Sequence, residues 1–383
     1  MIEIARPYWR KRLDDAWKKA PIVWLSGVRR VGKTTLAKSI EGALYLNCDL
    51  PSTAERVADP ERFLRSVDRS VVVLDEIHQL PDPSRILKIA ADEFPRLRLL
   101  ATGSSTLAAT GKFKDSLSGR KRTVHLLPVL ASELGGFRIA DLSRRLLRGG
   151  LPGALLADEH EPELYAEWLD SYFARDVQEL FSVSKRTPFL ALVQALLRQS
   201  GGLVEITKLA ALVGLSRPTT MSYLDAIEVT QVASVLRPYH GGGARELTHQ
   251  PKVFGFDTGF VAWSRGWNEL RAADSGQLWE HVVLETLQAS VVPRGISVHF
   301  WRDKRQREVD FVIPAGRNAA HAIECKWSAA AFETRGLTAF RAEHPRGRNF
   351  LVVPGESTRD RKFGDLVATI TSAEDLPELL ESR

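Results

Sequence analysis

Residues Gly27 to Thr35, with the sequence GVRRVGKTT, contain the residue types and spacing of a phosphate-binding loop. An apolar strand is predicted at Ile22 to Leu25, and a helix is predicted to begin near Lys33. Gly27 and Gly32 allow backbone conformations that a Cβ forbids, so consecutive N–H groups can curl around a phosphate. In this Walker A pattern the lysine reaches the β- and γ-phosphates, and the next hydroxyl binds Mg²⁺. The predicted nucleotide-binding residues are Gly27, Val28, Arg29, Arg30, Val31, Gly32, Lys33, Thr34 and Thr35, with Thr34 also a metal ligand.

A second pattern, VVVLDEIH, begins at Val71. Its four aliphatic residues predict a strand buried on both faces, and two carboxylates follow. We expect Asp75 to hold Mg²⁺, directly or through water, and Glu76 to polarise the attacking water. A third strand, residues 97–101, leads into Thr102, which we expect beside the γ-phosphate and Glu76. The predicted catalytic groups are therefore Lys33, Glu76 and Thr102.

Strands and helices alternate through the first 130 residues, which predicts an α/β fold with a parallel, doubly wound sheet. The expected elements are strands at 43–47 and 123–127, and helices at 33–40, 53–68 and 83–94. Helices interrupted at Gly149 to Gly153 are expected from residue 132 to about residue 180, as a lid. At 383 residues the chain is expected to form several domains.

Six segments, in this order, resemble a widespread prokaryotic family of AAA+-type ATPases with a C-terminal domain of long-uncharacterised function. The archaeal ATPases of the STAND signalling clade are similar. The segments are GVRRVGKTTL, VVVLDEIHQL, LLATGSS, SLSGR, RGGLPGAL and YFARDVQEL. The resemblance implies ATP and Mg²⁺ as cofactors, a sensor role for Thr102, and contact of Pro152 with the adenine. Arg120 belongs either to a solvated basic loop or to a phosphate contact such as an arginine finger, acting in cis or in trans.

Residues 189–262 predict a winged helix-turn-helix. Two helices flank the turn Gly214 to Ser216, Ser216 is placed to cap the second helix, and Pro218 suits its first turn. The segments 232–236, 241–243 and 246–248 are expected to form a hairpin wing. DNA-binding surfaces are basic, yet residues 191–262 hold six Lys/Arg against five Asp/Glu. DNA contact through Arg217 and protein scaffolding therefore both remain open.

The C-terminal part contains Asp310 on one predicted strand and Glu324-Cys325-Lys326 on the next. Alternate residues of a strand share a face, so these polar side chains would meet, with Glu280 of a helix at 277–289 nearby. The spacing resembles the PD-(D/E)xK restriction-endonuclease fold. There, Glu280, Asp310 and Glu324 would form a second metal site, and Lys326 would assist Asp310 and Glu324 in cleavage. The alternative is an ordinary cross-strand ion-pair cluster that cleaves nothing.

The sequence therefore predicts an ATPase core at 1–130, a helical lid at 131–188, a winged helix at 189–262 and a nuclease-like domain at 263–383. One hypothesis is an ATP-driven switch coupled to DNA or other nucleic acid. The other is a STAND-like signalling or scaffolding ATPase with a protein partner or a homo-oligomeric assembly. The net charge of +6 permits an anionic partner without requiring one. Two cysteines and no long apolar run favour a cytoplasmic protein with no membrane partner.

Overall fold

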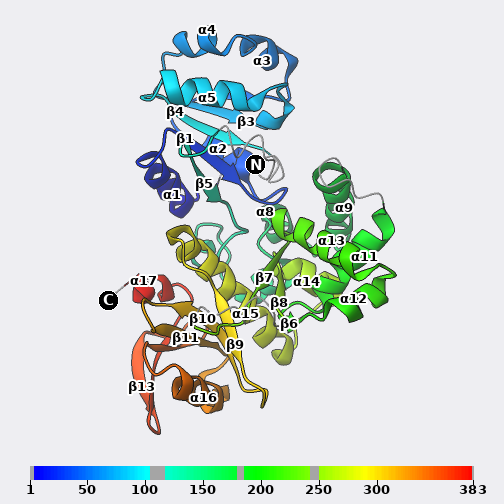
Figure 1. Cartoon of the computed structure of the whole chain (residues 1–383), viewed down its shortest axis with the longest axis vertical. Helices are drawn as coiled ribbons and strands as arrows, with labels where there is room; N and C mark the ends of the chain where they lie inside the picture. The colour runs from blue at the N-terminus through cyan, green and yellow to red at the C-terminus, as the bar shows by residue number, and fades with distance from the viewer. Residues whose placement is uncertain (1–3, 104–116, 179–184, 242–249, 382–383) are drawn as a thin grey trace.

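The computed structural model describes residues 4–103, 117–178, 185–241 and 250–381. Five parallel strands form its first sheet, in the order β2-β3-β4-β1-β5 (Figure 1). They are β1 (Ile22–Ser26), β2 (Leu44–Asn47), β3 (Val71–Asp75), β4 (Arg98–Thr102) and β5 (Lys121–His125). Strand β4 lies between β1 and β3, and Thr102 is its last residue. Thr102 therefore lies between the loop that follows β1 and the two acids, Asp75 and Glu76, at the end of β3. The parallel α/β sheet expected from the sequence is confirmed.

Both faces of this sheet are buried. Val23, Leu25 and Val73 pack into one apolar core, whereas Trp24 and Val72 pack into another. This alternation explains why β1 and β3 read as unbroken apolar runs. The surrounding helices are α1 (Pro7–Trp17), α2 (Lys33–Lys38), α3 (Pro51–Arg56), α4 (Pro60–Arg65), the 3₁₀ turn η1 (Ile77–Gln79) and α5 (Pro83–Glu93).

Three boundaries differ from the sequence prediction. The single helix expected at 53–68 is two helices, because Pro60 cannot continue a helix and Asp59 caps a new one by accepting a hydrogen bond from Arg62 N. The helix predicted to reach residue 40 ends at Lys38. The strand predicted at 123–127 is β5, which begins at Lys121 because its pairing with β1 starts at that register.

The predicted lid is a set of short helices. They are η3 (Ala131–Glu133), α7 (Leu142–Arg148), α8 (Pro152–Leu156), α9 (Glu163–Tyr172) and the π-helical turn η4 (Phe173–Val177), which continues α9. The interruption predicted at Gly149 to Gly153 is confirmed between α7 and α8. Two further interruptions, between η3 and α7 and between α8 and α9, were not predicted.

The next unit packs three helices against a three-stranded sheet in the order β6-β8-β7. Its elements are α11 (Arg186–Arg198), β6 (Gly202–Leu203), α12 (Ile206–Val213), α13 (Arg217–Val229), β7 (Ala233–Leu236) and β8 (Lys252–Gly255). Ser216 Oγ accepts a hydrogen bond from Thr219 N and Pro218 lies in the first turn of α13, as predicted. Residues 242–249, which include segments 242–243 and 246–248 of the expected wing, lie outside the described residues.

The C-terminal part is a six-stranded mixed sheet in the order β13-β14-β12-β11-β10-β9. Its strands are β9 (His299–Arg302), β10 (Glu308–Pro314), β11 (Ala320–Cys325), β12 (Asn349–Val352), β13 (Arg359–Phe363) and β14 (Leu366–Thr371). Its helices are α14 (Thr258–Ser264), α15 (Ala272–Ser290), η6 (Val292–Arg294), η7 (Ala329–Ala331), α16 (Arg335–Glu343) and α17 (Leu376–Glu381). The helix expected at 277–289 is the longer α15. In Figure 1 it lies between this sheet and the rest of the molecule.

Candidate nucleotide site

The loop between β1 and α2 has the backbone that its glycines predicted. Gly27 and Gly32 have φ values of 147° and 102°, and a Cβ on Gly27 would lie 2.6 Å from the carbonyl oxygen of Leu126. Arg30 also adopts a left-handed φ of 60°, which is uncommon for a residue with a side chain. The sequence did not reveal this strained position. Such backbone strain is concentrated at functional loops.

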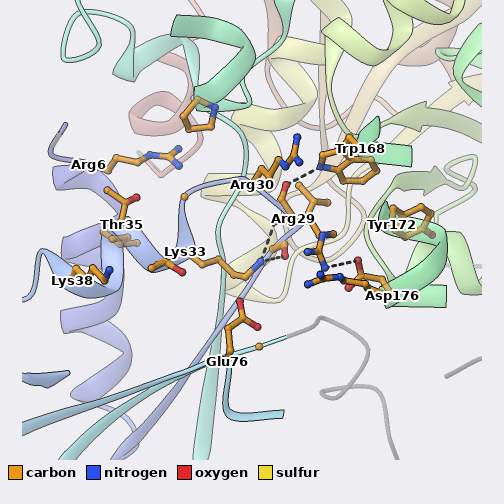
Figure 2. A pocket seen from close by; sticks show the side chains of 18 of the residues that line it. Arg6, Arg29, Arg30, Lys33, Thr35, Lys38, Glu76, Trp168, Tyr172 and Asp176 are labelled. Carbon is orange, nitrogen blue, oxygen red and sulfur yellow. Dashed lines mark hydrogen bonds and ion pairs between the residues drawn. The ribbon is translucent and has the colours of Figure 1, made fainter. Parts of the chain in front are cut away.

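Lys33 points into a pocket of about 1280 Å³ that this loop lines (Figure 2). Its ammonium donates hydrogen bonds to the carbonyl oxygens of Gly27 and Val28, at 2.7 and 3.1 Å. Burial lowers the pKa of Lys33, while the carboxylate of Glu76 opposes that shift. The pocket therefore has a desolvated cation at its base, where it would interact strongly with an anion.

Asp75, at the end of β3, has a hydrogen-bond donor on each carboxylate oxygen. Thr102 Oγ1 donates to Oδ1, and the Tyr45 hydroxyl donates to Oδ2 at 2.6 Å. Asp75 is 2% exposed and does not line the pocket. The two hydroxyls therefore hold the Asp75 carboxylate behind the pocket rather than on its surface. Tyr45 was not predicted, because its role depends on β2 pairing with β3.

Glu76 does line the pocket, and Figure 2 shows it below the ammonium of Lys33. Its backbone has a left-handed φ of 56°, and its N–H donates to Thr102 Oγ1 at 3.0 Å. Burial raises the pKa of its carboxyl group, and the nearby His78, whose Nδ1 lies 3.3 Å from Glu76 Oε2, opposes that shift. Thr102 thus contacts both acids through one hydroxyl. It is completely buried, and it holds the two acids rather than facing the pocket.

Residues of α9 and η4, in the predicted lid, line another part of the pocket. Trp168 Nε1 donates to the carbonyl oxygen of Arg29 at 3.0 Å, and Arg29 Nη1 lies 3.7 Å from Asp176 Oδ2 (Figure 2). Tyr172 and Arg175 of the same helical segment also line the pocket. Sequence analysis missed these residues. The available signal was the YFARDVQEL segment, which identified a family but not a contact.

The predicted nucleotide-binding residues divide into two groups. Most line the pocket: Gly27, Val28, Arg29, Arg30, Gly32, Lys33, Thr34, Thr35 and Pro152. Val31 does not, because its side chain is fully buried in the core. Arg120, the possible arginine finger, does not line the pocket either. Its guanidinium pairs with Asp92 on α5, with Nε 2.6 Å from Oδ1. The structure therefore does not bring Arg120 to the site in cis.

The loop that carries Pro152 is fixed from a distant part of the chain. Gly150 N donates to Asp257 Oδ2 at 2.7 Å, and a Cβ on Gly149 would lie 1.8 Å from Asp257 Oδ1. Arg145, fully buried on α7, donates to Thr258 Oγ1 and to Glu285 Oε2. Asp257 and Thr258 belong to the segment KVFGFDTG, residues 252–259. These contacts give that segment a structural role, which the sequence alone did not indicate.

The C-terminal residues predicted to meet do so. Asp310 is on β10 and Glu324 is on β11. Lys326 Nζ lies 3.6 Å from Asp310 Oδ2 and 3.1 Å from Glu324 Oε2. Burial, followed by the charge of Asp310, raises the pKa of Glu324 and raises that of Glu280 to about 8. Lys252, which was not predicted, pairs with Glu308 at the edge of this group.

Within residues 4–103, 117–178, 185–241 and 250–381, no group of three or more His, Cys, Asp or Glu side chains is arranged to hold a metal ion. The acids Glu280, Asp310 and Glu324 have lysines beside them. Among the same residues, no helix is both long and apolar enough to span a membrane.

Comparison with known families now adds to this geometry. Residues 19–135 match the model of the AAA domain family. This part of the chain is similar to AAA domains. Together with the parallel sheet, the match supports an α/β P-loop fold. Residues 139–271 and 275–373 match two further families, each described as a domain of unknown function, DUF8612 and DUF4143.

Two relatives show how far the similarity extends. The "Uncharacterized protein Rv2008c" of Mycobacterium tuberculosis is 28% identical over 358 residues, covering 90% of this chain and 79% of the relative. The "Uncharacterized protein MJ1544" of Methanocaldococcus jannaschii is 22% identical over 323 residues, covering 75% of this chain and 70% of the relative. Among solved structures, the Walker-type ATPase PABY2304 of Pyrococcus abyssi has a TM-score of 0.43 at 14% identity, covering 68% of this chain and 96% of that one.

Proposed function

We propose that the protein binds and hydrolyses ATP with Mg²⁺ in the pocket between the phosphate-binding loop and the lid, and that hydrolysis drives a conformational switch. The observation that carries the proposal is the placement of Lys33 and Glu76 on one pocket, with Asp75 fixed behind them. The match of residues 19–135 to the AAA domain family supports it.

The roles of the residues follow from their positions. Lys33 would exchange the carbonyls of Gly27 and Val28 for phosphate oxygens, which are stronger acceptors because they are charged. Glu76, with a raised pKa, would accept a proton from the attacking water more readily than an ordinary carboxylate. Pro152, opposite Gly32, would contact the adenine.

The side chains fit a magnesium ion bound together with the nucleotide. Thr34 lines the pocket, and Asp75 would accept a hydrogen bond from metal-bound water through a lone pair that the Thr102 and Tyr45 hydroxyls leave open. Mg²⁺ commonly takes few protein ligands and completes its shell with waters and phosphate oxygens. When bound, it would neutralise charge on the β- and γ-phosphates.

The test is equilibrium binding of ATP and release of phosphate by the whole chain. Lys33→Met should abolish both, while Lys19→Met, an exposed residue that does not line the pocket, should change neither. Full ATP turnover by the Lys33→Met variant would refute the proposal.

A second candidate function concerns residues 263–383, as a nuclease-like domain that cleaves nucleic acid presented by a winged helix at 189–262. The contact of Lys326 with both Asp310 and Glu324 favours it, because a metal-dependent cleavage site needs these groups together. Asp310→Asn and Glu324→Gln should each abolish cleavage of a plasmid with Mg²⁺ or Mn²⁺ and leave ATP turnover intact. If no cleavage occurs in the parent protein, this candidate fails.

A second lysine among the acids, Lys252, is not part of the predicted nuclease pattern and favours the alternative, a STAND-like scaffold that binds a protein partner. Measuring ATP turnover with and without duplex DNA distinguishes the nuclease-like function from the scaffold function. Binding through the exposed Arg217 should weaken steeply as salt rises and should weaken again in Arg217→Ala. Indifference to DNA would favour the scaffold.

A further inference from the structure

An imidazole lies beside Glu76, the carboxylate to which the base role is assigned. His78 Nδ1 is 3.3 Å from Glu76 Oε2, and both side chains line the nucleotide pocket. The backbone makes this contact possible. Glu76 has a left-handed φ of 56° and immediately precedes the 3₁₀ turn η1, which carries His78. The turn therefore brings the side chains of two residues close in sequence to the same part of the pocket.

The next residue, Gln79, indicates which imidazole nitrogen of His78 carries the proton. The amide nitrogen Nε2 of Gln79 lies 3.2 Å from His78 Nε2. An amide nitrogen can only donate a hydrogen bond, so His78 Nε2 must accept it. In a neutral imidazole the other nitrogen then carries the proton. His78 Nδ1 is therefore an N–H donor adjacent to Glu76 Oε2.

The Nδ1 donor of His78 has no other use in the part of the chain that the structure describes. Nδ1 is buried and makes no hydrogen bond with those residues. A buried donor without an acceptor costs free energy, so a hydrogen bond to the adjacent carboxylate is favoured. Hydrogen bonds between catalytic groups are often poorly aligned until the substrate binds. The distance of 3.3 Å between Nδ1 and Oε2 fits such a bond before it tightens.

The residue after β4 leaves room for this imidazole. A Cβ on Gly103 would lie 3.2 Å from His78 Nδ1 and 3.0 Å from the Trp24 ring. Trp24 is fully buried in the core, so the ring has little freedom to move away. Glycine at position 103 therefore leaves the space in which His78 lies beside Glu76.

We propose that His78 is a positioning residue for ATP hydrolysis, whose Nδ1–H donates to Glu76 Oε2 and leaves Oε1 free to accept a proton from the attacking water. The inference rests on the proposed ATPase function. In the reaction, the water oxygen bonds to the γ-phosphorus, its proton passes to Glu76, and the bond to the bridging oxygen breaks with its electron pair on ADP. Holding the carboxylate in one orientation speeds this step without strengthening nucleotide binding.

The experiment compares equilibrium ATP binding with single-turnover phosphate release by the whole chain. His78→Leu should slow release by about tenfold, which is part of the roughly hundredfold or greater contribution of a positioned base, and should leave the Kd for ATP unchanged. His78→Asn should recover most of the lost rate, because its amide can donate from the Nδ1 position. His78→Gln should not, because its amide reaches the Nε2 position instead. His344→Leu, outside the nucleotide pocket, is the matched control.

A double-mutant cycle tests whether His78 acts through Glu76. Glu76→Gln has no carboxylate base to position, so adding His78→Leu to it should slow phosphate release no further. If His78→Leu causes the same loss in both backgrounds, His78 acts independently of Glu76 and the inference is overturned. A rate in His78→Asn as low as that in His78→Leu would also overturn it, because a donor at the Nδ1 position would then have no effect.

The outcomes distinguish this inference from the function on which it rests. Hydrolysis by His78→Leu at the parent rate, or a loss explained by weaker ATP binding alone, would overturn the positioning role and leave the ATPase function standing. No hydrolysis by the parent protein would overturn both. Thermal melts verify folding. If His78→Leu does not fold, His78→Gln takes its place in every comparison, because it also lacks a donor at the Nδ1 position.

Discussion

Arg145 and Glu285 form a buried ion pair, with Nη2 2.5 Å from Oε2, that joins α7 of the lid to α15 of the C-terminal part. The Arg145 side chain is completely enclosed, and its Nε donates to the carbonyl oxygen of Val129. A buried charge that loses its partner retains its desolvation cost. Each member of the pair therefore depends on the other to remain buried between these two helices.

Replacing Arg145 with methionine should lower the free energy of unfolding by about 3–5 kcal/mol, because Glu285 would be left without a cation. Denaturant unfolding of the whole chain measures the change. The double variant Arg145→Met, Glu285→Leu is the control, and it should recover much of the loss. A single variant as stable as the parent would contradict the assigned role of the pair.

The same pair predicts a dependence on pH. Burial raises the pKa of Glu285 to about 7 from an ordinary value of 4.5, although Arg145 opposes the shift. Between pH 4.5 and about 7, the Glu285 carboxyl group keeps its proton in the folded protein but loses it in the unfolded chain. The contribution of Glu285 to the free energy of unfolding is therefore complete below pH 4.5 and is lost as the pH rises to about 7. Unfolding measured across this range should show a smaller decline in Glu285→Gln. An unchanged slope would contradict the prediction.

Replacing Glu76 with glutamine should preserve ATP binding and slow hydrolysis by about a hundredfold or more, the usual contribution of a positioned general base. Glutamine keeps the size of the side chain but cannot take a proton from water. Equilibrium binding and single-turnover phosphate release separate the two effects. Hydrolysis at the parent rate would exclude Glu76 as the base. Glu93→Gln, an exposed change that does not line the pocket, is the matched control.

Replacing Asp176 with asparagine should strengthen ATP binding. Arg29 would no longer pair with the lid and would be available to the phosphates. Since partly exposed ion pairs contribute about 0.2–1 kcal/mol, the Kd should fall no more than about fivefold. Asp170→Asn is the control, because Asp170 pairs with Arg186 outside the pocket. Weaker or unchanged binding in Asp176→Asn would show that the pair does not restrain Arg29.

Local patterns in the sequence predicted the phosphate-binding loop, the acidic strand end and the parallel sheet. Gly27, Lys33 and Asp75 belong to short motifs whose chemistry depends on neighbours in the chain. Tyr45, Trp168 and Lys252 were missed because each acts on a partner from another element. Their pairing depends on strand order and on how the units dock. For Arg120 the sequence left a solvated loop and a phosphate contact open, and its guanidinium pairs with Asp92 on α5.

Family boundaries at residues 135–139 and 271–275 suggest three interchangeable parts. The interior does not divide at those boundaries. One continuous apolar core includes Trp9, Phe260 and Leu376, and the Arg145–Glu285 pair crosses the boundary at residues 271–275. A part transplanted into a different protein would carry an enclosed arginine or glutamate without its partner. We therefore expect that fusions exchanging these parts between relatives will require a matching change at the other member of this pair.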